Sequence, residues 1–288
     1  MTSRDAAAET AFGPMVLAAI EHNEPPDRRL VDDDLAESFL PNRFRLLVRC
    51  TRVAAVRRAV IAAADRSGPG LWASIACRKR YIDERLSDPL NDTDAVVVLG
   101  AGLDTRSCRI ARHSTMPVFE VDQQINVDRK QAVLRRTLGE VPSSVRLVGV
   151  DLERGQAMPA LRAQGYDTRA RTFFSRAPLT PFPDAVRATL TQLDGAAEGS
   201  KLIFSYIRQD FIDGTDLYGA RSVYRRFRQR RAVWKSGLVP EHVGELLADH
   251  GWRLVEQAGP SYYRDTYIRP TGRPLAASPL EWTVFAER

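Results

Sequence analysis

The stretch that most constrains this fold lies at 95–100, where AVVVLG forms a continuous apolar run that ends in glycine. A strand that is buried on both faces of a parallel sheet has this pattern. Similar strand-like runs recur further along the chain, at 117–122, 144–151, 169–175 and 200–207. Helix-like stretches lie between them, at 104–113, 125–139 and 183–193. This alternation predicts right-handed βαβ units, and therefore an α/β fold around a parallel sheet.

The two ends of the chain carry further elements. Residues from about 30 to 88 have apolar side chains at helical spacing, and the acidic run 32–34 suits a helix N-terminus. Near the end, 240–251 predicts a helix, and 252–259 and 280–288 predict two more strands. We therefore expect four parts: a helical cap at 1–90, a ligand-binding core at 91–206, a lid at 207–238 and the last part of the core sheet at 239–288.

Composition limits the class of protein. With 288 residues, 44% hydrophobic and 27% charged, the chain can bury a full core. It has no run of about 18 apolar residues and no secretory signal pattern, so we expect a cytoplasmic protein without a membrane partner. The three cysteines predict neither a disulfide framework nor a metal site. The net charge of +6 indicates either a solvated arginine-rich surface or a field that attracts anionic ligands, and no nucleic-acid motif accompanies it.

A glycine turn, Gly100-Ala101-Gly102, follows the first strand. Glycines let the backbone turn sharply and approach a ligand at the carboxyl end of a strand, where open α/β sheets bind nucleotides. In a GxGxxG dinucleotide motif a third glycine would stand where this chain has Thr105. The turn therefore favours a nucleoside without a pyrophosphate, and a nicotinamide dehydrogenase is the weaker alternative.

Acidic residues close the next two strands. Asp122 ends the second strand, at the place from which a carboxylate can accept both ribose hydroxyls. Asp151 ends the third strand, where it can accept from an adenine amino group while Leu152 packs against the ring. Each acid alone can equally cap the turn after its strand. Together with the glycine turn, the two acids predict a site for S-adenosylmethionine.

The strings around the glycine turn are more specific. VVLGAGLDTR at 97–106, preceded by RKRYID at 78–83 and followed by FEVD at 119–122, resembles the leucine carboxyl methyltransferase family and its bacterial branch of tetracenomycin-type polyketide O-methyltransferases. The resemblance covers most of the chain, from about residue 30 to its end. It implies a Rossmann-like class I methyltransferase fold with a seven-stranded, mostly parallel sheet whose last strand is antiparallel. It also implies helices on both faces, an N-terminal helical cap and an inserted lid.

Carried over position by position, the resemblance implies a site for S-adenosylmethionine. Arg78 would pair with the methionine carboxylate, a task that suits a guanidinium, and Arg80 is the alternative. The other implied cofactor contacts lie in the glycine turn and at the ends of the strands, at Gly100, Ala101, Gly102, Asp122, Asp151, Leu152 and Ser175. Asp104 is expected to cap the helix that begins at Thr105, and Arg106 is expected to form a structural ion pair.

One segment departs from the family pattern. After the fourth strand, 175–183 reads SRAPLTPFP, which is shorter than the usual family segment and lacks its glutamate and glycine. Arg176 is an unusual neighbour for a sulfonium cation unless a substrate carboxylate offsets it. Two functions therefore stay open: an O-methyltransferase, and an S-adenosylmethionine-binding protein that has lost methyl transfer and acts as a cyclase or a binding protein.

The acceptor is expected under the lid. The expected substrate-binding residues are Tyr206, Arg221, Tyr224, Arg225 and Arg228. Between 218 and 234 the arginines either form a solvated face or hold an anionic, aromatic small molecule of a polyketide type. A carboxylate acceptor needs no general base, whereas a phenol does. No histidine has the context of a base, and His22, Arg176 and Tyr206 are the only catalytic candidates, so a carboxyl acceptor is favoured. We expect a monomer or a homodimer.

Overall fold

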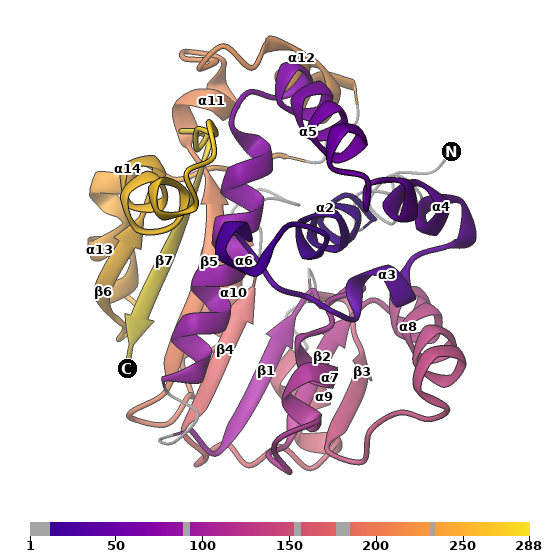
Figure 1. Ribbon diagram of the computed structural model, residues 1–288. Helices are drawn as coiled ribbons and strands as arrows, with labels where there is room; N and C mark the ends of the chain where they lie inside the picture. The colour runs from indigo at the N-terminus through magenta and orange to yellow at the C-terminus, as the bar shows by residue number, and fades with distance from the viewer. Residues whose placement is uncertain (1–11, 89–92, 153–156, 177–184, 231–233) are drawn as a thin grey trace.

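A computed structural model describes residues 12–88, 93–152, 157–176, 185–230 and 234–288. Their strands form one sheet in the order β3-β2-β1-β4-β5-β7-β6 (Figure 1). The strands are β1 (Ala95–Leu99), β2 (Val118–Asp122), β3 (Val145–Gly149), β4 (Thr172–Arg176), β5 (Lys201–Ile207), β6 (Arg253–Ala258) and β7 (Glu281–Glu287). The first five strands are parallel, and β7 runs antiparallel between β5 and β6. The expected seven-stranded sheet with an antiparallel last strand is confirmed.

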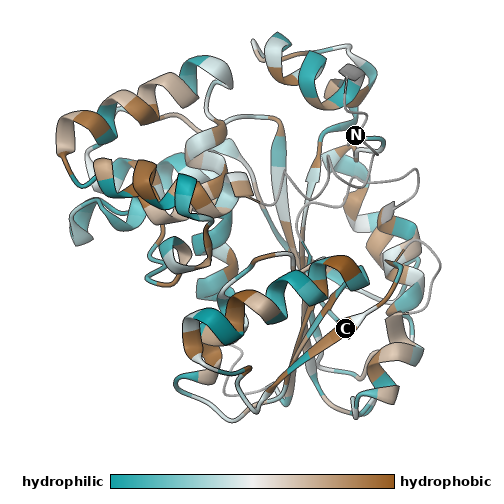
Figure 2. Cartoon of the chain, turned by 90° about the vertical axis from the view of Figure 1, so that its right-hand side faces the viewer, coloured by the Kyte–Doolittle hydropathy of each residue, from teal (hydrophilic) through white to brown (hydrophobic). Residues whose placement is uncertain are grey.

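Helices cover both faces of the sheet because successive strand residues point to opposite sides. One face, formed by Val96 and Val98 of β1, packs against α6 (Leu71–Ser87), α7 (Arg106–Ala111) and α8 (Gln124–Leu138). The other face, formed by Val97 and Leu99, packs against α9 (Ala157–Ala163), α10 (Ala185–Gln192) and α13 (Val243–Ala248). In the side view of Figure 2 the strands lie between the two helical layers.

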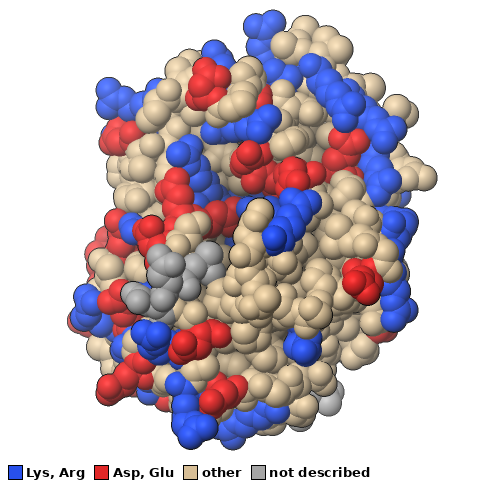
Figure 3. Space-filling view, turned by 60° about the horizontal axis from the view of Figure 1, so that its bottom comes forward, with Lys and Arg blue, Asp and Glu red and all other residues tan. Residues whose placement is uncertain are grey.

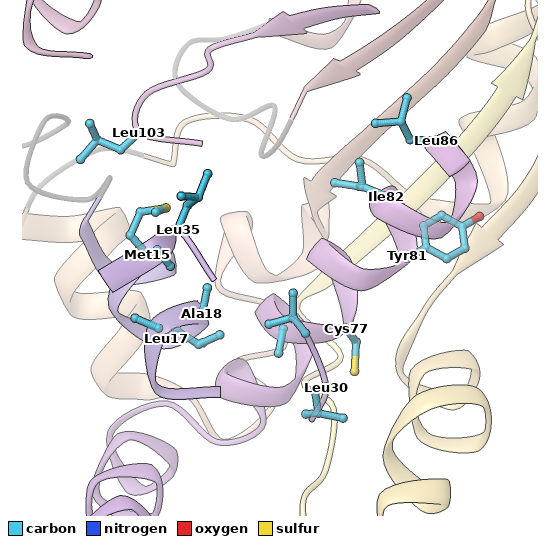
Figure 4. Close-up of a cluster of buried hydrophobic side chains, with 14 of the residues drawn as sticks. Met15, Leu17, Ala18, Leu30, Leu35, Cys77, Tyr81, Ile82, Leu86 and Leu103 are labelled. Carbon is cyan, nitrogen blue, oxygen red and sulfur yellow. The ribbon is translucent and has the colours of Figure 1, made fainter. Parts of the chain in front are cut away.

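An N-terminal layer of helices covers the α6 side. It contains α2 (Phe12–His22), α3 (Ala36–Phe39), α4 (Asn42–Cys50) and α5 (Ala54–Ser67). Figure 4 shows how Met15 and Leu17 of α2 join Cys77 and Tyr81 of α6 in one buried cluster that extends to Leu103, next to the glycine turn. The helical region therefore packs directly against the segment that follows β1.

The remaining helices are short. After β5 come α11 (Gln209–Asp213), α12 (Arg221–Val223) and a π-helical turn, η4 (Tyr224–Arg230); α14 (Pro260–Tyr263) and the π-helical η6 (Arg264–Ile268) join β6 to β7. Short 3-10 helices are η1 (Pro26–Arg28), η5 (Pro240–His242) and η7 (Arg269–Thr271). α12 lies beside α5 (Figure 1), and Ser222 Oγ donates to the Ser67 carbonyl at 2.6 Å.

The surface carries both signs of charge. On the face in Figure 3, Lys and Arg side chains are interspersed with Asp and Glu side chains. On this face the pattern is that of a solvated surface. No helix within the described ranges is long and apolar enough to cross a membrane.

Candidate functional site

The glycine turn lies directly after β1, at the carboxyl edge of the sheet. Gly100 and Gly102 have positive φ angles of 69° and 51°, a conformation that favours glycine. The Gly100 amide donates to the Val121 carbonyl of β2 at 2.7 Å, which fixes the turn to its neighbouring strand. Ala101, between the two glycines, is buried. A side-chain carbon added at Gly100 would meet no atom of the described residues within 4 Å, so these residues leave the backbone there uncovered.

Asp122 ties the end of β2 to this turn. Its Oδ2 accepts from the Gly102 amide at 2.7 Å. Its Oδ1 accepts from the Gln123 amide at 2.7 Å and from Asn126 Nδ2 at 2.8 Å. The side chain is only half-buried, and a carboxylate can accept about four hydrogen bonds. Asp122 therefore keeps accepting capacity for a further donor, such as a hydroxyl group of a ligand.

Glu120 lies on the same face of β2 but is enclosed by protein. Its carboxylate is buried and lies 2.6 Å from Lys130 Nζ. Burial raises the pKa of Glu120 above its ordinary value, although the Lys130 charge opposes this. Lys130 also donates to the Asp104 carbonyl, so the Glu120–Lys130 pair is linked to the segment that follows the glycine turn.

The residues after the turn brace it against the N-terminal helices. The Asp104 carboxylate accepts from the Arg106 amide at 2.8 Å, and Arg106 pairs with Asp104 and with Asp83 of α6, both at 2.6 Å. The structural ion pair of Arg106 is therefore confirmed. The helix begins at Arg106 and not at Thr105, its N-cap is Thr105, and Asp104 binds the amide of its first residue. Burial acts to raise the pKa of Asp83, but the Arg106 charge helps to hold it below its ordinary value. Thr105 Oγ1 donates to Asp33 at 2.7 Å.

The acidic run 32–34 does not have the role that was expected of it. It was expected to begin a helix, but α3 begins at Ala36, and Asp33 instead accepts from Thr105. Asp33 is buried and also lies 3.5 Å from Lys79 Nζ. The carboxylate is needed to hold the glycine-turn segment, which is a long-range contact that local helix signals do not describe.

The end of β3 reaches the same edge of the sheet. The Val150 amide donates to the Asp122 carbonyl at 2.8 Å, and Asp151 and Leu152 follow directly. Both are half-buried, and the Leu152 carbonyl accepts from Gln192 Nε2 of α10 at 3.2 Å. The structure thus brings the two residues beside the end of β2, and their contacts with adenine stay predictions.

β4 places Ser175 and Arg176 beside β1. Ser175 is in register with Val98, and Arg176 is in register with Leu99. Both are buried, and Arg176 Nη1 donates to Thr189 Oγ1 of α10 at 3.1 Å. Because side chains alternate along a strand, Ser175 is on the opposite face, toward α6. The rest of the altered segment, 177–183, lies outside the described residues.

Arg78 extends from α6 to the ends of β5 and β7. Its Nη1 donates to Glu281, which also accepts from Ser205 Oγ of β5 at 2.7 Å. Arg78 is buried, and its Nε has no hydrogen-bond partner in the described part of the chain. Arg80 instead lies over the ring of Tyr267 at 4.8 Å. Of the two arginines, Arg78 is the one with an unused buried donor for a carboxylate.

Two of the catalytic candidates lie apart from each other. Tyr206 is fully buried on the α13 side of the sheet, where its hydroxyl donates to Gln257 at 2.8 Å and burial raises its pKa. His22 ends α2 and hydrogen-bonds Asp32 at 2.6 Å. It lines a cavity of 420 Å³ together with Asp33. The structure therefore does not bring Tyr206 and His22 to one place.

The segment predicted to form a lid, 207–238, directs aromatic residues inward. Tyr224 packs edge-to-face on Phe211 of α11, with ring centroids 5.5 Å apart. Arg228 is half-buried, and its Nε donates to the Ile212 carbonyl at 3.2 Å. Arg221 and Arg225 are exposed. Arg226 is exposed as well, so three arginines of this segment are available to attract an anionic molecule.

Sequence reasoning missed the acidic partners that hold these elements together. Asp33, Asp83 and Glu281 bind Thr105, Arg106 and Arg78 across large separations in sequence. No local signal marked Asp83 or Glu281 as a partner. In the described segments no group of three or more His, Cys, Asp and Glu side chains could hold a metal ion.

Sequence comparisons place the chain among methyltransferases. The leucine carboxyl methyltransferase family model matches residues 11–194. A Mycolicibacterium smegmatis protein, named as a candidate S-adenosyl-L-methionine-dependent methyltransferase, is 30% identical over 268 residues, which cover 87% of this chain and 79% of that protein. A Mycobacterium avium protein with the same description is 30% identical over 211 residues, 72% of this chain. This chain matches only 63% of the Mycobacterium avium protein's length, and only 66% of a Mycobacterium marinum relative.

Structural comparison agrees on the fold. The crystal structure of a candidate methyltransferase from Thermobifida fusca has a TM-score of 0.55 and 21% identity, and the match covers 81% of this chain and 88% of that one. A DUF574 family protein from Streptomyces avermitilis has a TM-score of 0.56 and 16% identity, with 81% and 90% coverage. Identities this low show the fold alone, which is the class I methyltransferase fold. The family match carries the assignment further, and the chain belongs to the leucine carboxyl methyltransferase family.

Proposed function

We propose that this protein transfers a methyl group from S-adenosylmethionine to an oxygen atom of a small acceptor, and that the acceptor oxygen belongs to a carboxylate. The observation that carries the proposal is the link between the glycine turn and Asp122, a 2.7 Å hydrogen bond from the Gly102 amide, next to Gly100, whose backbone no described residue covers. The relatives named as S-adenosyl-L-methionine-dependent methyltransferases support the same cofactor.

The residues of this edge fit a nucleoside that carries an amino acid. Asp122 offers a half-buried carboxylate for ribose hydroxyls, and Arg78 offers an unused buried N–H for a carboxylate. Thr105 fits a dinucleotide poorly, because its hydroxyl is bound to Asp33 at 2.7 Å where a third glycine would let a pyrophosphate approach. These features favour S-adenosylmethionine over a nicotinamide cofactor.

The chain's own contribution to methyl transfer is alignment. S-adenosylmethionine, when bound, supplies a methyl group on a sulfonium centre, and an in-line displacement then depends on holding the acceptor oxygen against it. A carboxylate is ionised at neutral pH and needs no proton removed, whereas a phenol has an ordinary pKa of about 10. His22 is hydrogen-bonded to Asp32 at 2.6 Å, an arrangement that would also orient a general base, so His22 is the residue whose replacement tests the carboxyl acceptor.

An anionic, aromatic acceptor is supported by the lid. Arg221 and Arg225 are exposed on it, so their charges can attract an anion from solution. Tyr224 and Phe227 lie between these arginines and the core beneath the lid, where an aromatic ring of an acceptor could pack on them. The polyketide type of the acceptor rests on the family resemblance.

Two measurements test the proposal. Isothermal titration should show binding of S-adenosylhomocysteine and no binding of NAD. Mass spectrometry should then show that benzoic acids gain one methyl group faster than phenols with the same ring substituents. Binding of NAD instead would refute the cofactor assignment, and faster methylation of the phenols would refute the carboxyl acceptor.

A second function is favoured by one observation. Arg176 is a buried cation at the end of β4, where the family resemblance predicts an acidic residue near the cofactor. This substitution supports an S-adenosylmethionine-binding protein without methyl transfer. Conversion of an acceptor without consumption of S-adenosylmethionine would identify that function.

A further inference from the structure

Exposed apolar side chains concentrate at the turn between α4 and α5. Of the eight large hydrophobic residues that are exposed within the described ranges, four lie between 46 and 56. Leu46 and Val53 have the highest values, 67% and 60%, and Leu47 and Val56 are 40% and 37% exposed. We call these four residues the α4–α5 patch. Apolar side chains that gather on a surface mark a contact with a partner or a membrane.

The two helices hold the patch away from the core. α4 buries only Val48, and α5 buries only Arg57 and Ile61 of its 14 residues. Both helices lie on the outside of the helical cap (Figure 1). None of the four patch residues lines the cavity at His22 or the cavity at His242. The patch therefore projects from the molecule instead of lining a groove.

The same segment carries the excess positive charge of the chain. Between 42 and 64 the sequence has six arginines and no lysine, aspartate or glutamate. This charge equals the net charge of the whole chain, +6, so the rest of the sequence is balanced. Arg43 and Arg58 are exposed and form no ion pair with the described residues. Their charges are therefore available to an anionic partner.

Two more exposed arginines share one carboxylate. Arg49 lies 3.0 Å and Arg52 lies 3.3 Å from Glu37, and the arginine side chains are 61% and 64% exposed. One carboxylate balances only one of the two cations. The α4–α5 patch is therefore flanked by four exposed arginines, and a single acidic side chain of the described residues pairs with them.

This combination of charge and shape selects the occupant. A second copy of the chain would bring two strongly basic segments together, which like charges oppose. A partner helix typically binds in an apolar groove, and a projecting patch does not offer one. An anionic lipid bilayer suits both features, because apolar side chains enter the boundary between headgroups and acyl chains while arginines stay near the phosphates.

We infer that the α4–α5 patch docks the protein on the surface of an anionic lipid bilayer. Leu46 and Val53 enter the bilayer boundary, and Arg43 and Arg58 pair with lipid phosphates. The expectation of no membrane partner considered only apolar runs long enough to span a bilayer, whereas surface binding needs only short amphipathic helices. The inference concerns where the protein is held and does not depend on its cofactor or acceptor.

Vesicle sedimentation tests the inference directly. The wild type should bind vesicles of phosphatidylcholine and phosphatidylserine, and should not bind vesicles of phosphatidylcholine alone. The double variant Leu46→Ser, Val53→Ser should bind the anionic vesicles about tenfold more weakly or worse, because it loses the apolar contact. The matched control is Ile125→Ser, Val255→Ser, whose residues are 56% and 43% exposed on α8 and β6. It should bind like the wild type.

A second pair of variants tests the charges. Arg43→Gln, Arg58→Gln should weaken binding to the anionic vesicles about 25-fold, because each basic residue near such a surface contributes about fivefold. Arg253→Gln, Arg269→Gln is the control, since it removes the same charge from side chains that are 70% and 73% exposed elsewhere. It should change binding by about twofold or less. All replaced side chains are exposed, so the fold should stay intact.

A label on Cys50 reports which surface touches the bilayer. Cys50 is exposed on α4, whereas Cys77 and Cys108 are buried, so a maleimide dye labels Cys50. Spin-labelled lipids should quench this dye when anionic vesicles are added. Vesicle binding without quenching, or binding that Leu46→Ser, Val53→Ser does not weaken, would overturn the inference. So would a wild type that stays free of the anionic vesicles but binds an acidic protein, or forms dimers that Leu46→Ser, Val53→Ser disperses.

Discussion

Replacing Asp122 by alanine should weaken cofactor binding strongly. The carboxylate has three donors in the protein, the Gly102 and Gln123 amides and Asn126 Nδ2, all within 2.8 Å. In the proposed complex it also accepts from the ribose hydroxyls. A hydrogen bond to a charged group contributes about 1.5–3 kcal/mol, and each 1.4 kcal/mol is a tenfold change in Kd, so affinity for S-adenosylhomocysteine should fall about 10- to 150-fold.

The assay must separate ligand contact from damage to the turn. Isothermal titration with S-adenosylhomocysteine gives the affinity, and urea denaturation gives the free energy of unfolding of the same variant. Asn126→Ala is the matched control, because it removes one donor to Asp122 but keeps the carboxylate and the Gly102 bond. We expect Asn126→Ala to change Kd by about threefold or less, because this hydrogen bond does not touch the ligand and the carboxylate keeps its two backbone donors.

One result would refute the ribose assignment. An Asp122→Ala protein that folds and binds S-adenosylhomocysteine with wild-type affinity cannot use this carboxylate for the ligand. Glu120 is not a substitute, because it is buried against Lys130 at 2.6 Å. In that case the hydroxyls would have to be bound by another group at this edge, and the proposed orientation of the cofactor would be wrong.

The remaining predictions concern stability and the acceptor. Asp83→Asn should lower the free energy of unfolding by about 3 kcal/mol, measured in urea at neutral pH, because Arg106 loses a charged partner at 2.6 Å. Burial raises the pKa of Asp83, but Arg106, Arg109 and Lys79 outweigh it and lower the pKa. The stabilisation by Asp83 is therefore complete above its unfolded-state pKa of about 3.9 and is lost as the pH falls through its folded-state pKa. Lowering the pH should therefore reduce the free energy of unfolding more steeply for the wild type than for Asp83→Asn. Arg221→Gln or Arg225→Gln should raise KM for a benzoic acid but leave cofactor affinity unchanged. Added salt should reduce the difference in KM between the wild type and each variant. An unchanged KM in both variants would show that the arginines form only a solvated face. The methylation rate should stay flat from about pH 6 to 8, and a steep rise that disappears in His22→Gln would indicate a phenol acceptor.

The sheet could be predicted because its signal is local. All five residues of β1 are buried, so the whole run 95–99 is apolar, and the glycine turn that follows needs positive φ. The places of Asp122 and Asp151 could be predicted as well, because parallel strands bring their carboxyl ends to one edge of the sheet. The sequence therefore identified the edge of the sheet and the residues that stand on it.

The helices were harder to predict where burial hides their periodicity. α2 lies within the expected helical cap but carries no local helix signal, because its residues Leu17 to Glu21 are all buried and no polar face marks the helix. The region from about 30 to 88 has helical spacing throughout, but it divides into α3, α4, α5 and α6. In the lid, Tyr218 has a positive φ of 48°, and helix begins only at Arg221. These breaks depend on what each segment packs against.

The charge pairs at the site could not be predicted, because they join distant parts of the chain. Arg78 shares the inner face of α6 with Tyr81 and Ile82, three and four residues later, and a cation on such a face requires a buried acidic partner. The chain has 36 acidic residues, and nothing local distinguishes Glu281 among them. The choice is made by topology, because β7 enters the sheet beside β5 and its first residue thereby meets α6. A sequence that shows an arginine on the apolar face of a helix therefore predicts that an acidic partner exists, and only the strand order identifies it.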